Sequence, residues 1–327
     1  TNNGTKGNPC LIADLFGDFR EEIILRKKDN TAVRIYMNTE LTKHKLFTLM
    51  HDSQYRCGVA WQNNCYNQPG YTSFYYGSDM DFHQVLPEMN AKPVIYIAGD
   101  STAQSYSKDS RPQYGWGEML LANLFPEDCI AASHRPDCEF DQELRYENRH
   151  LIVDNCAMAG RSSKTFREEG RLKDIDRHIK EGDYLLIQFG HNDASTSKKE
   201  RYVPVEEFAQ SLEYYIETAR KHGAVPVLVS SIALRPCAET DMGEKGEIKK
   251  LLPDYAKVME RLAAEEDGII YIDMGALTVE ACKQVGEENT RLWYKEDNVH
   301  LVEAGADIYG KLLAEQMKGL IIDFESK

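Results

Sequence analysis

From residue 92 onward, short apolar runs alternate with longer segments in which apolar residues recur at helical spacing. The apolar runs are continuous, as in strands buried on both faces of a sheet, and lie at 94–98, 151–153, 184–189, 225–229 and 269–272. The helix-like segments between or after them lie at 116–124, 205–222, 252–266 and 302–318. Alternation of strands and helices predicts an α/β fold with a central parallel sheet covered by helices on both faces.

Residues 1–90 have a different pattern. Short β-favouring runs, separated by turn-prone segments, lie at 22–25, 32–37, 57–61 and 72–76. Helical periodicity is visible only over 42–50. The change of pattern predicts two domains, a small all-β segment over 1–90 and an α/β domain over 91–327, which agrees with the length of the chain.

Composition narrows the class of protein. Of the 327 residues, 42% are hydrophobic and 28% charged, which is typical of a soluble globular protein. No run approaches the roughly 18 apolar residues of a membrane helix, and no signal peptide is visible in the polar first residues. The net charge of −14 argues against nucleic acid as a partner. Composition leaves the compartment and the oligomeric state open.

The eight cysteines do not point to a metal site or a disulfide scaffold, because no two of them form a C-x-x-C pair. We expect most of them to be free thiols, because cysteine often acts as a small core residue. A bridge between Cys129 and Cys138 is an alternative that the sequence leaves open.

Polar clusters follow three of the predicted strands, and a fourth precedes the last predicted helix. They lie at 99–102 (GDST), 155–163 (NCAMAGRSS), 190–193 (GHND) and 297–301 (DNVHL). In a parallel sheet, ligands bind beyond the carboxyl ends of the strands. These clusters can therefore share one rim of the sheet.

The residue types in these clusters suit nucleophilic catalysis. A serine such as Ser101 becomes a nucleophile when a base within hydrogen-bonding reach takes its proton, and His300 can be that base. Asp297, three residues earlier, can orient and stabilise the imidazole. The backbone N–H groups of Ser101 and Gly160 and the amide of Asn192 can stabilise an oxyanion. This chemistry requires no metal and no cofactor.

Each cluster alone has an ordinary structural explanation. Gly-Asp-Ser and Gly-His-Asn-Asp are turn sequences, Gly160 can be a loop glycine, and Asp-x-x-His can be a helix cap. Their order after successive strands makes the catalytic interpretation stronger.

In this order, the clusters resemble the four blocks of the SGNH (GDSL) hydrolases, which supply Ser, Gly, Asn and His. Ser101, Gly160, Asn192 and His300 match these blocks, and Asp297 matches the acid of the triad. The resemblance implies a three-layer, flavodoxin-like fold and a serine esterase. The stretches 99–102, 159–163, 189–193 and 297–301 are similar to the rhamnogalacturonan acetylesterase branch, although Arg235 is followed by Pro236 where that branch often has paired arginines.

Residues 13–22, 49–56, 60–63 and 66–69 resemble the C-terminal end of rhamnogalacturonan lyases built on a β-propeller. About 85 residues match, too few for a propeller, so lyase activity is expected to be absent. Together the two resemblances imply an O-acetylesterase acting on acetylated polysaccharide or oligosaccharide of pectin, and they favour an extracellular location. The alternatives are a GDSL lipase or lysophospholipase, an acetylxylan esterase, or an inactive carbohydrate-binding protein. In an acidic protein, local cations must attract such an acidic substrate, and Arg161 and Lys164 are the candidates.

Overall fold

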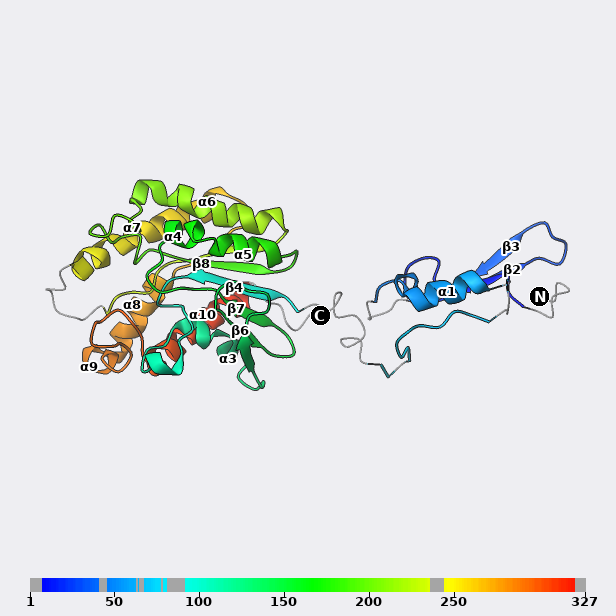
Figure 1. The fold of residues 1–327 in the computed structure, drawn as a ribbon, viewed down its shortest axis with the longest axis horizontal. Coiled ribbons are helices and arrows are strands. Elements are labelled where there is room, and N and C mark those ends of the chain that lie inside the picture. Colours follow the sequence, from blue (N-terminus) through cyan, green and yellow to red (C-terminus); the bar gives the residue numbers. More distant parts are fainter. Residues whose placement is uncertain are drawn as a thin grey trace. The chain divides into compact units, whose positions relative to one another are not determined.

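The chain folds into two compact units, which comprise Thr1–Ala91 and Lys92–Lys327. The computed structural model describes residues 8–40, 46–62, 64, 68–77, 79–80, 92–235 and 244–320. Figure 1 shows both units, and each is described separately below.

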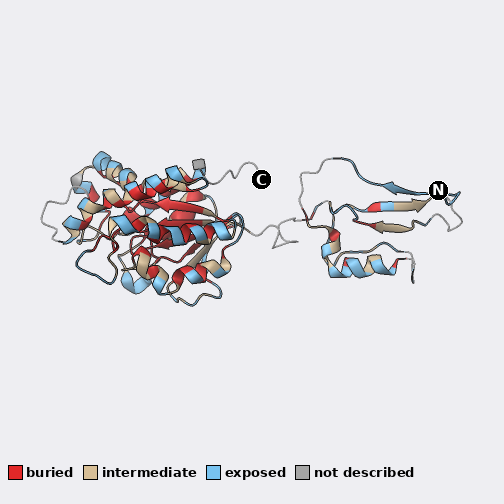
Figure 2. Ribbon diagram, turned by 90° about the horizontal axis from the view of Figure 1, so that it is seen from above, coloured by how far each residue is buried: buried red, intermediate tan, exposed pale blue. Residues whose placement is uncertain are grey.

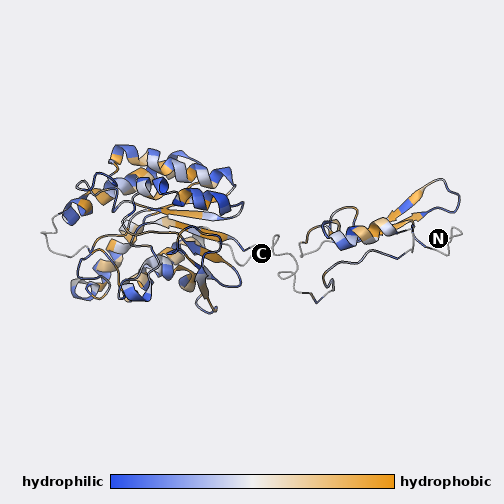
Figure 3. Ribbon diagram, in the orientation of Figure 1, coloured by the Kyte–Doolittle hydropathy of each residue, from blue (hydrophilic) through white to orange (hydrophobic). Residues whose placement is uncertain are grey.

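The second unit is built on a seven-stranded sheet in the order β10-β9-β8-β4-β7-β6-β5. Its five parallel strands are β4 (Val94–Gly99), β7 (Ile152–Asn155), β8 (Tyr184–Gln188), β9 (Val225–Val229) and β10 (Ile270–Ile272). Every residue of β4, the middle strand, is buried. Figure 3 shows the central, parallel strands of this sheet as predominantly hydrophobic. These pairings confirm the predicted parallel sheet. Its strands are apolar because both faces of the sheet are covered by other parts of the protein.

One edge of the sheet is antiparallel. β6 (Leu144–Glu147) pairs with β7, and β5 (Ala131–His134) pairs with β6. These strands are exposed or only partly buried, so they lack the apolar runs by which the other strands were predicted.

Helices cover both faces of the sheet and make three layers (Figure 1). One layer contains α4 (Ser163–Glu168), α5 (Arg171–His178), α6 (Val205–Lys221) and α7 (Glu244–Glu265). The other contains α3 (Leu120–Leu124), α8 (Met274–Val285), α9 (Glu287–Thr290) and α10 (Glu303–Leu320). Figure 2 shows buried strands between helices whose outer faces are exposed. Within the described ranges, no helix combines the length and the apolar character needed to cross a bilayer.

The first unit contains a three-stranded antiparallel sheet of β1 (Leu11–Ala13), β2 (Glu22–Arg26) and β3 (Val33–Tyr36). The Asp14 carboxylate, next to β1, accepts hydrogen bonds from four backbone N–H groups, those of residues 17, 18, 19 and 49. These bonds are 2.7–3.2 Å long, and the bond from residue 49 is the shortest. A small core of Phe19, Leu46, Leu49, Tyr55 and Met80 lies beside it.

The prediction of an all-β segment was wrong at 57–61, which belongs to helix α1 (Ser53–Trp61). The Asp52 side chain caps this helix by accepting a hydrogen bond from the Tyr55 N–H. Tyr55 and Val59 then face the same small core, because residues four apart share one face of a helix. The predicted strand at 72–76 is also absent, since these residues form bends and irregular chain.

Candidate active site

Ser101 lies in the turn that follows β4, the middle strand of the sheet. Its side chain is part of a buried turn in which Asp100 accepts hydrogen bonds from the N–H and the hydroxyl of Thr102. The Tyr106 hydroxyl donates to the Ser101 carbonyl oxygen over 2.7 Å. The residue as a whole is 9% exposed.

The structure brings Ser101, His300 and Asp297 into one chain of contacts. His300 Nε2 lies 3.0 Å from Ser101 Oγ, and His300 Nδ1 lies 2.6 Å from Asp297 Oδ2. This arrangement places the ring proton on Nδ1 and leaves Nε2 as an acceptor for the serine proton. The predicted nucleophile, base and orienting acid therefore contact one another in the order that ester hydrolysis needs.

Asp297 is ionised by its surroundings. Burial opposes the charged form, but hydrogen bonds from the His300 ring and from the N–H groups of Val299 and His300 outweigh burial and hold the pKa of the Asp297 carboxyl well below its ordinary value. Hydrogen bonds to a carboxylate favour its charged form. The negative charge of Asp297 can therefore stabilise the imidazolium that forms when His300 takes up a proton.

The loop that carries Asp297 and His300 is anchored by cations that sequence analysis did not identify. Arg235 donates to Asn298 twice, from its N–H to the carbonyl at 3.0 Å and from Nη1 to Oδ1 at 2.8 Å. Lys245 Nζ donates to the Asp297 carbonyl over 2.9 Å. Asn298 has a φ of 60°, a left-handed conformation that Asn tolerates better than most residues. These contacts join parts of the chain that lie far apart in sequence, so no local pattern indicates them.

Gly160 and Asn192 lie on the loops next to Ser101. Ser101 follows β4, while Gly160 and Asn192 follow β7 and β8, the two strands that flank β4 in the sheet. In the described part of the chain, the N–H groups of Ser101 and Gly160 have no acceptor. Asn192 donates one amide hydrogen to the Arg161 carbonyl at 2.8 Å, and its second amide hydrogen is left for another acceptor. These donors suit a developing oxyanion.

The buried carboxyl group of Asp193 holds two of these loops together through hydrogen bonds. Asp193 accepts hydrogen bonds from the N–H and the hydroxyl of Ser163 and from the N–H of Gly190. Burial nevertheless raises the pKa of Asp193 to about 7. Asp193 ties the loop after β8 to the start of α4, and the sequence offered no signal for this role.

Arg161, one of two candidate cations for an acidic substrate, already has a carboxylate partner. Its Nε lies 2.9 Å from both carboxylate oxygens of Glu169, and its Nη1 donates to the Ala159 carbonyl. Lys164 lies at the start of α4 and is partly exposed. The structure therefore weakens the expectation that Arg161 binds substrate.

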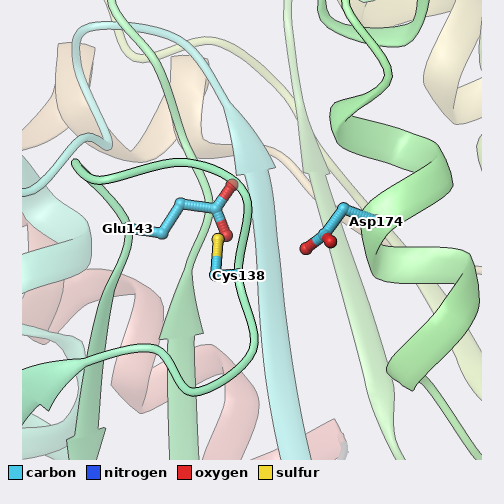
Figure 4. A group of neighbouring side chains, drawn as sticks. All are labelled: Cys138, Glu143 and Asp174. Atoms are coloured by element: carbon cyan, nitrogen blue, oxygen red, sulfur yellow. The ribbon is translucent and has the colours of Figure 1, made fainter.

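A second polar cluster lies away from the triad, where Cys138, Glu143 and Asp174 approach one another (Figure 4). The Arg135 guanidinium pairs with both carboxylates, with Nη1 2.6 Å from Glu143 Oε2. A buried cation therefore already balances these charges, and a metal ion does not fit there. The Cys138 thiol contacts the backbone of Phe140 and forms no disulfide with Cys129.

Two protein families match different parts of the chain. Residues 1–85 match the C-terminal domain of rhamnogalacturonan lyase family 11. Residues 95–313 match the GDSL-like lipase/acylhydrolase family. Both resemblances drawn from the sequence are confirmed.

Individual relatives divide the chain in the same way. Rhamnogalacturonan acetylesterase RhgT of Bacillus subtilis is 35% identical over 247 residues, which cover 71% of this chain and 93% of that protein. Rhamnogalacturonan exolyase YesX of Bacillus subtilis is 57% identical over 99 residues, 30% of this chain but only 15% of the lyase. The crystal structure of Bacillus subtilis protein YxiM has a TM-score of 0.52 at 26% identity and covers 70% of this chain and 58% of that one.

Proposed function

The chain belongs to the GDSL-like lipase/acylhydrolase family, and from this premise we propose that its esterase removes acetyl groups from pectic rhamnogalacturonan. The observation that carries the proposal is the chain of contacts from Ser101 through His300 to Asp297. We place the hydrolase domain at 91–327, after a lyase-like segment at 1–90.

In the first half of the reaction, Ser101 Oγ attacks the acetyl carbonyl carbon while His300 Nε2 takes the serine proton. Asp297 stabilises the imidazolium that forms, and its low pKa keeps it ionised throughout. The negative charge moves to the former carbonyl oxygen. The N–H groups of Ser101 and Gly160 and the amide of Asn192 stabilise this oxyanion.

In the second half, the tetrahedral intermediate collapses, and His300 gives its proton to the departing sugar oxygen. The sugar hydroxyl leaves, and the acetyl group stays on Ser101. Water then attacks the acetyl-enzyme with His300 again as base, and acetate departs with regeneration of the serine hydroxyl. Every proton in this scheme passes through His300.

Two comparisons support the substrate. RhgT, which covers most of the second unit, is named a rhamnogalacturonan acetylesterase. The first unit matches a rhamnogalacturonan lyase family, so both parts of the chain are similar to proteins named for the same polymer. Because pectin is a polymer outside the cell, an extracellular location of the esterase agrees with this substrate.

The test is acetate release from three substrates at equal ester concentration: acetylated rhamnogalacturonan, acetylated xylan and a short lipid ester. Ser101→Ala protein serves as the blank. We expect kcat/KM for acetylated rhamnogalacturonan to exceed the other two by at least tenfold. A preference for xylan or for the lipid ester would contradict the proposed substrate and leave the esterase chemistry in place.

A further inference from the structure

Most cations around the candidate site are already engaged with the protein. Arg161 pairs with Glu169, Arg235 donates to Asn298, and Lys245 donates to the Asp297 carbonyl. A substrate carboxylate would have to break these contacts to use the charges. Since the protein carries a net charge of −14, a cation without a carboxylate partner is the more effective anion site.

Arg201 is such a cation. In the described part of the chain its guanidinium pairs with no carboxylate. The two hydrogen bonds of the guanidinium are long, from Nη1 to the Gly160 carbonyl at 3.4 Å and from Nη2 to Ser195 Oγ at 3.5 Å. Its Nε is buried without a partner. Glu244 lies nearby, but the Ser195 hydroxyl, which donates to Glu244, separates it from the guanidinium.

The guanidinium of Arg201 lies directly beside the glycine of the candidate oxyanion site. A Cβ atom added to Gly160 would meet Arg201 Nη1 first, at 3.6 Å. The side chain is partly exposed, so its unused donors remain within reach of a ligand. Gly160 thus leaves open the space between the candidate oxyanion donor and a planar cation.

We propose that Arg201 binds the carboxylate of a uronate whose acetyl ester is held at Ser101 and Gly160. A guanidinium presents parallel N–H donors that match the two oxygens of a carboxylate. The interaction would select acetyl esters on acidic sugars over the same esters on neutral sugars. This inference rests on the proposed acetylesterase function and assigns its specificity to one residue.

The test compares Arg201→Gln with the wild type on two matched substrates and on 4-nitrophenyl acetate. The matched substrates are O-acetylated galacturonate oligosaccharides with free carboxylates and the same oligosaccharides with methyl-esterified carboxylates. A charge-assisted, two-pronged contact stabilises by about 1.5–3 kcal/mol, so KM for the free acid should rise roughly 10- to 150-fold. KM for the methyl ester and for 4-nitrophenyl acetate should stay within about twofold.

Two further variants separate charge from geometry. Arg201→Lys keeps the charge but not the fork, so it should recover part of the loss. Arg167→Gln is the matched control, because it also removes one positive charge, and the Arg167 guanidinium lies over the Tyr214 ring, 3.8 Å from its centroid. We expect the control to match the wild type on every substrate. Raising the salt concentration should increase KM for the free acid in the wild type and not in Arg201→Gln.

An equal loss on all three substrates would show that Arg201 only positions the Gly160 peptide, and would overturn the proposal. Unchanged kinetics on the free acid would overturn it too. If wild-type protein released no acetate from either oligosaccharide but did hydrolyse 4-nitrophenyl acetate, the proposed polymer itself would be wrong, and the role of Arg201 would fall with it.

Discussion

Replacement of Asp297 by Asn changes one contact of the triad and preserves the others. The two backbone N–H groups that donate to Asp297 Oδ1, at 2.9 Å each, can donate equally to the amide oxygen of Asn. The 2.6 Å contact with His300 Nδ1 is different, because an amide nitrogen there donates instead of accepting. His300 then carries its proton on Nε2, where it faces Ser101 and cannot accept the serine proton.

The expected cost follows from this change of tautomer. An orienting aspartate whose replacement leaves the imidazole in the wrong tautomer is worth about 10⁴ in kcat in serine hydrolases of this design. That factor corresponds to about 5.5 kcal/mol of transition-state free energy. Stability should fall far less. Since the pKa of Asp297 is lowered in the folded state, its charge stabilises the fold above the ordinary carboxyl pKa, and this contribution disappears as pH falls through the lowered pKa.

The assay is 4-nitrophenyl acetate hydrolysis at pH 7, at a temperature where circular dichroism shows the variant folded. Asp273→Asn is the matched control, because Asp273 also accepts a backbone N–H as the cap of α8 but contacts no residue of the triad. We expect the control to retain kcat within about twofold. A loss of less than tenfold in Asp297→Asn would refute the proposed role of Asp297.

Three other changes test the rest of the site. Ser101→Ala should abolish turnover of 4-nitrophenyl acetate with an unchanged circular dichroism spectrum, and residual activity above roughly 1% would identify another nucleophile. Asn192→Ala should lower kcat by about 10²–10³, with KM less affected, in steady-state kinetics; a change confined to KM would reassign Asn192 to substrate binding. Asp193 should make the fold less stable as pH rises, because its pKa is raised from 3.8 to about 7 and the folded state keeps a proton that the unfolded chain loses. Urea unfolding should show wild-type stability falling relative to Asp193→Asn by about 2 kcal/mol between pH 5 and 7, and a constant difference would contradict the raised pKa.

The buried strands could be predicted because a strand that is covered on both faces consists almost entirely of apolar residues. β4 is buried along its whole length, as its continuous apolar run predicts. β5 could not be predicted, because all four of its residues are exposed and only pairing with β6 makes it a strand. In α1 the sequence run at 57–61 suits either a strand or a helix, and the cap from Asp52 and the position of Tyr55 in the core decide for the helix.

The candidate site divides in the same way. Asp297 and His300 are close in sequence, so their contact could be predicted from spacing, and the order of the motifs placed Ser101 near them. Arg235 and Arg201 act on Asn298 and Gly160 across 63 and 41 positions. Such contacts arise only after the strands have aligned, and an arginine in a loop looks the same in sequence whether or not it reaches them.

The segment 297–300 carries both the base and the acid of the triad. Displacement of this one segment would therefore separate Ser101 from both of them. If heat detaches that short segment while the sheet remains intact, Ser101 loses base and acid at the same moment. Inactivation would then be reversible on cooling and would precede the loss of secondary structure. The temperature at which activity halves would report the docking equilibrium of one loop, and shortening the Arg235 or Lys245 side chain would lower it without shifting the melting of the sheet.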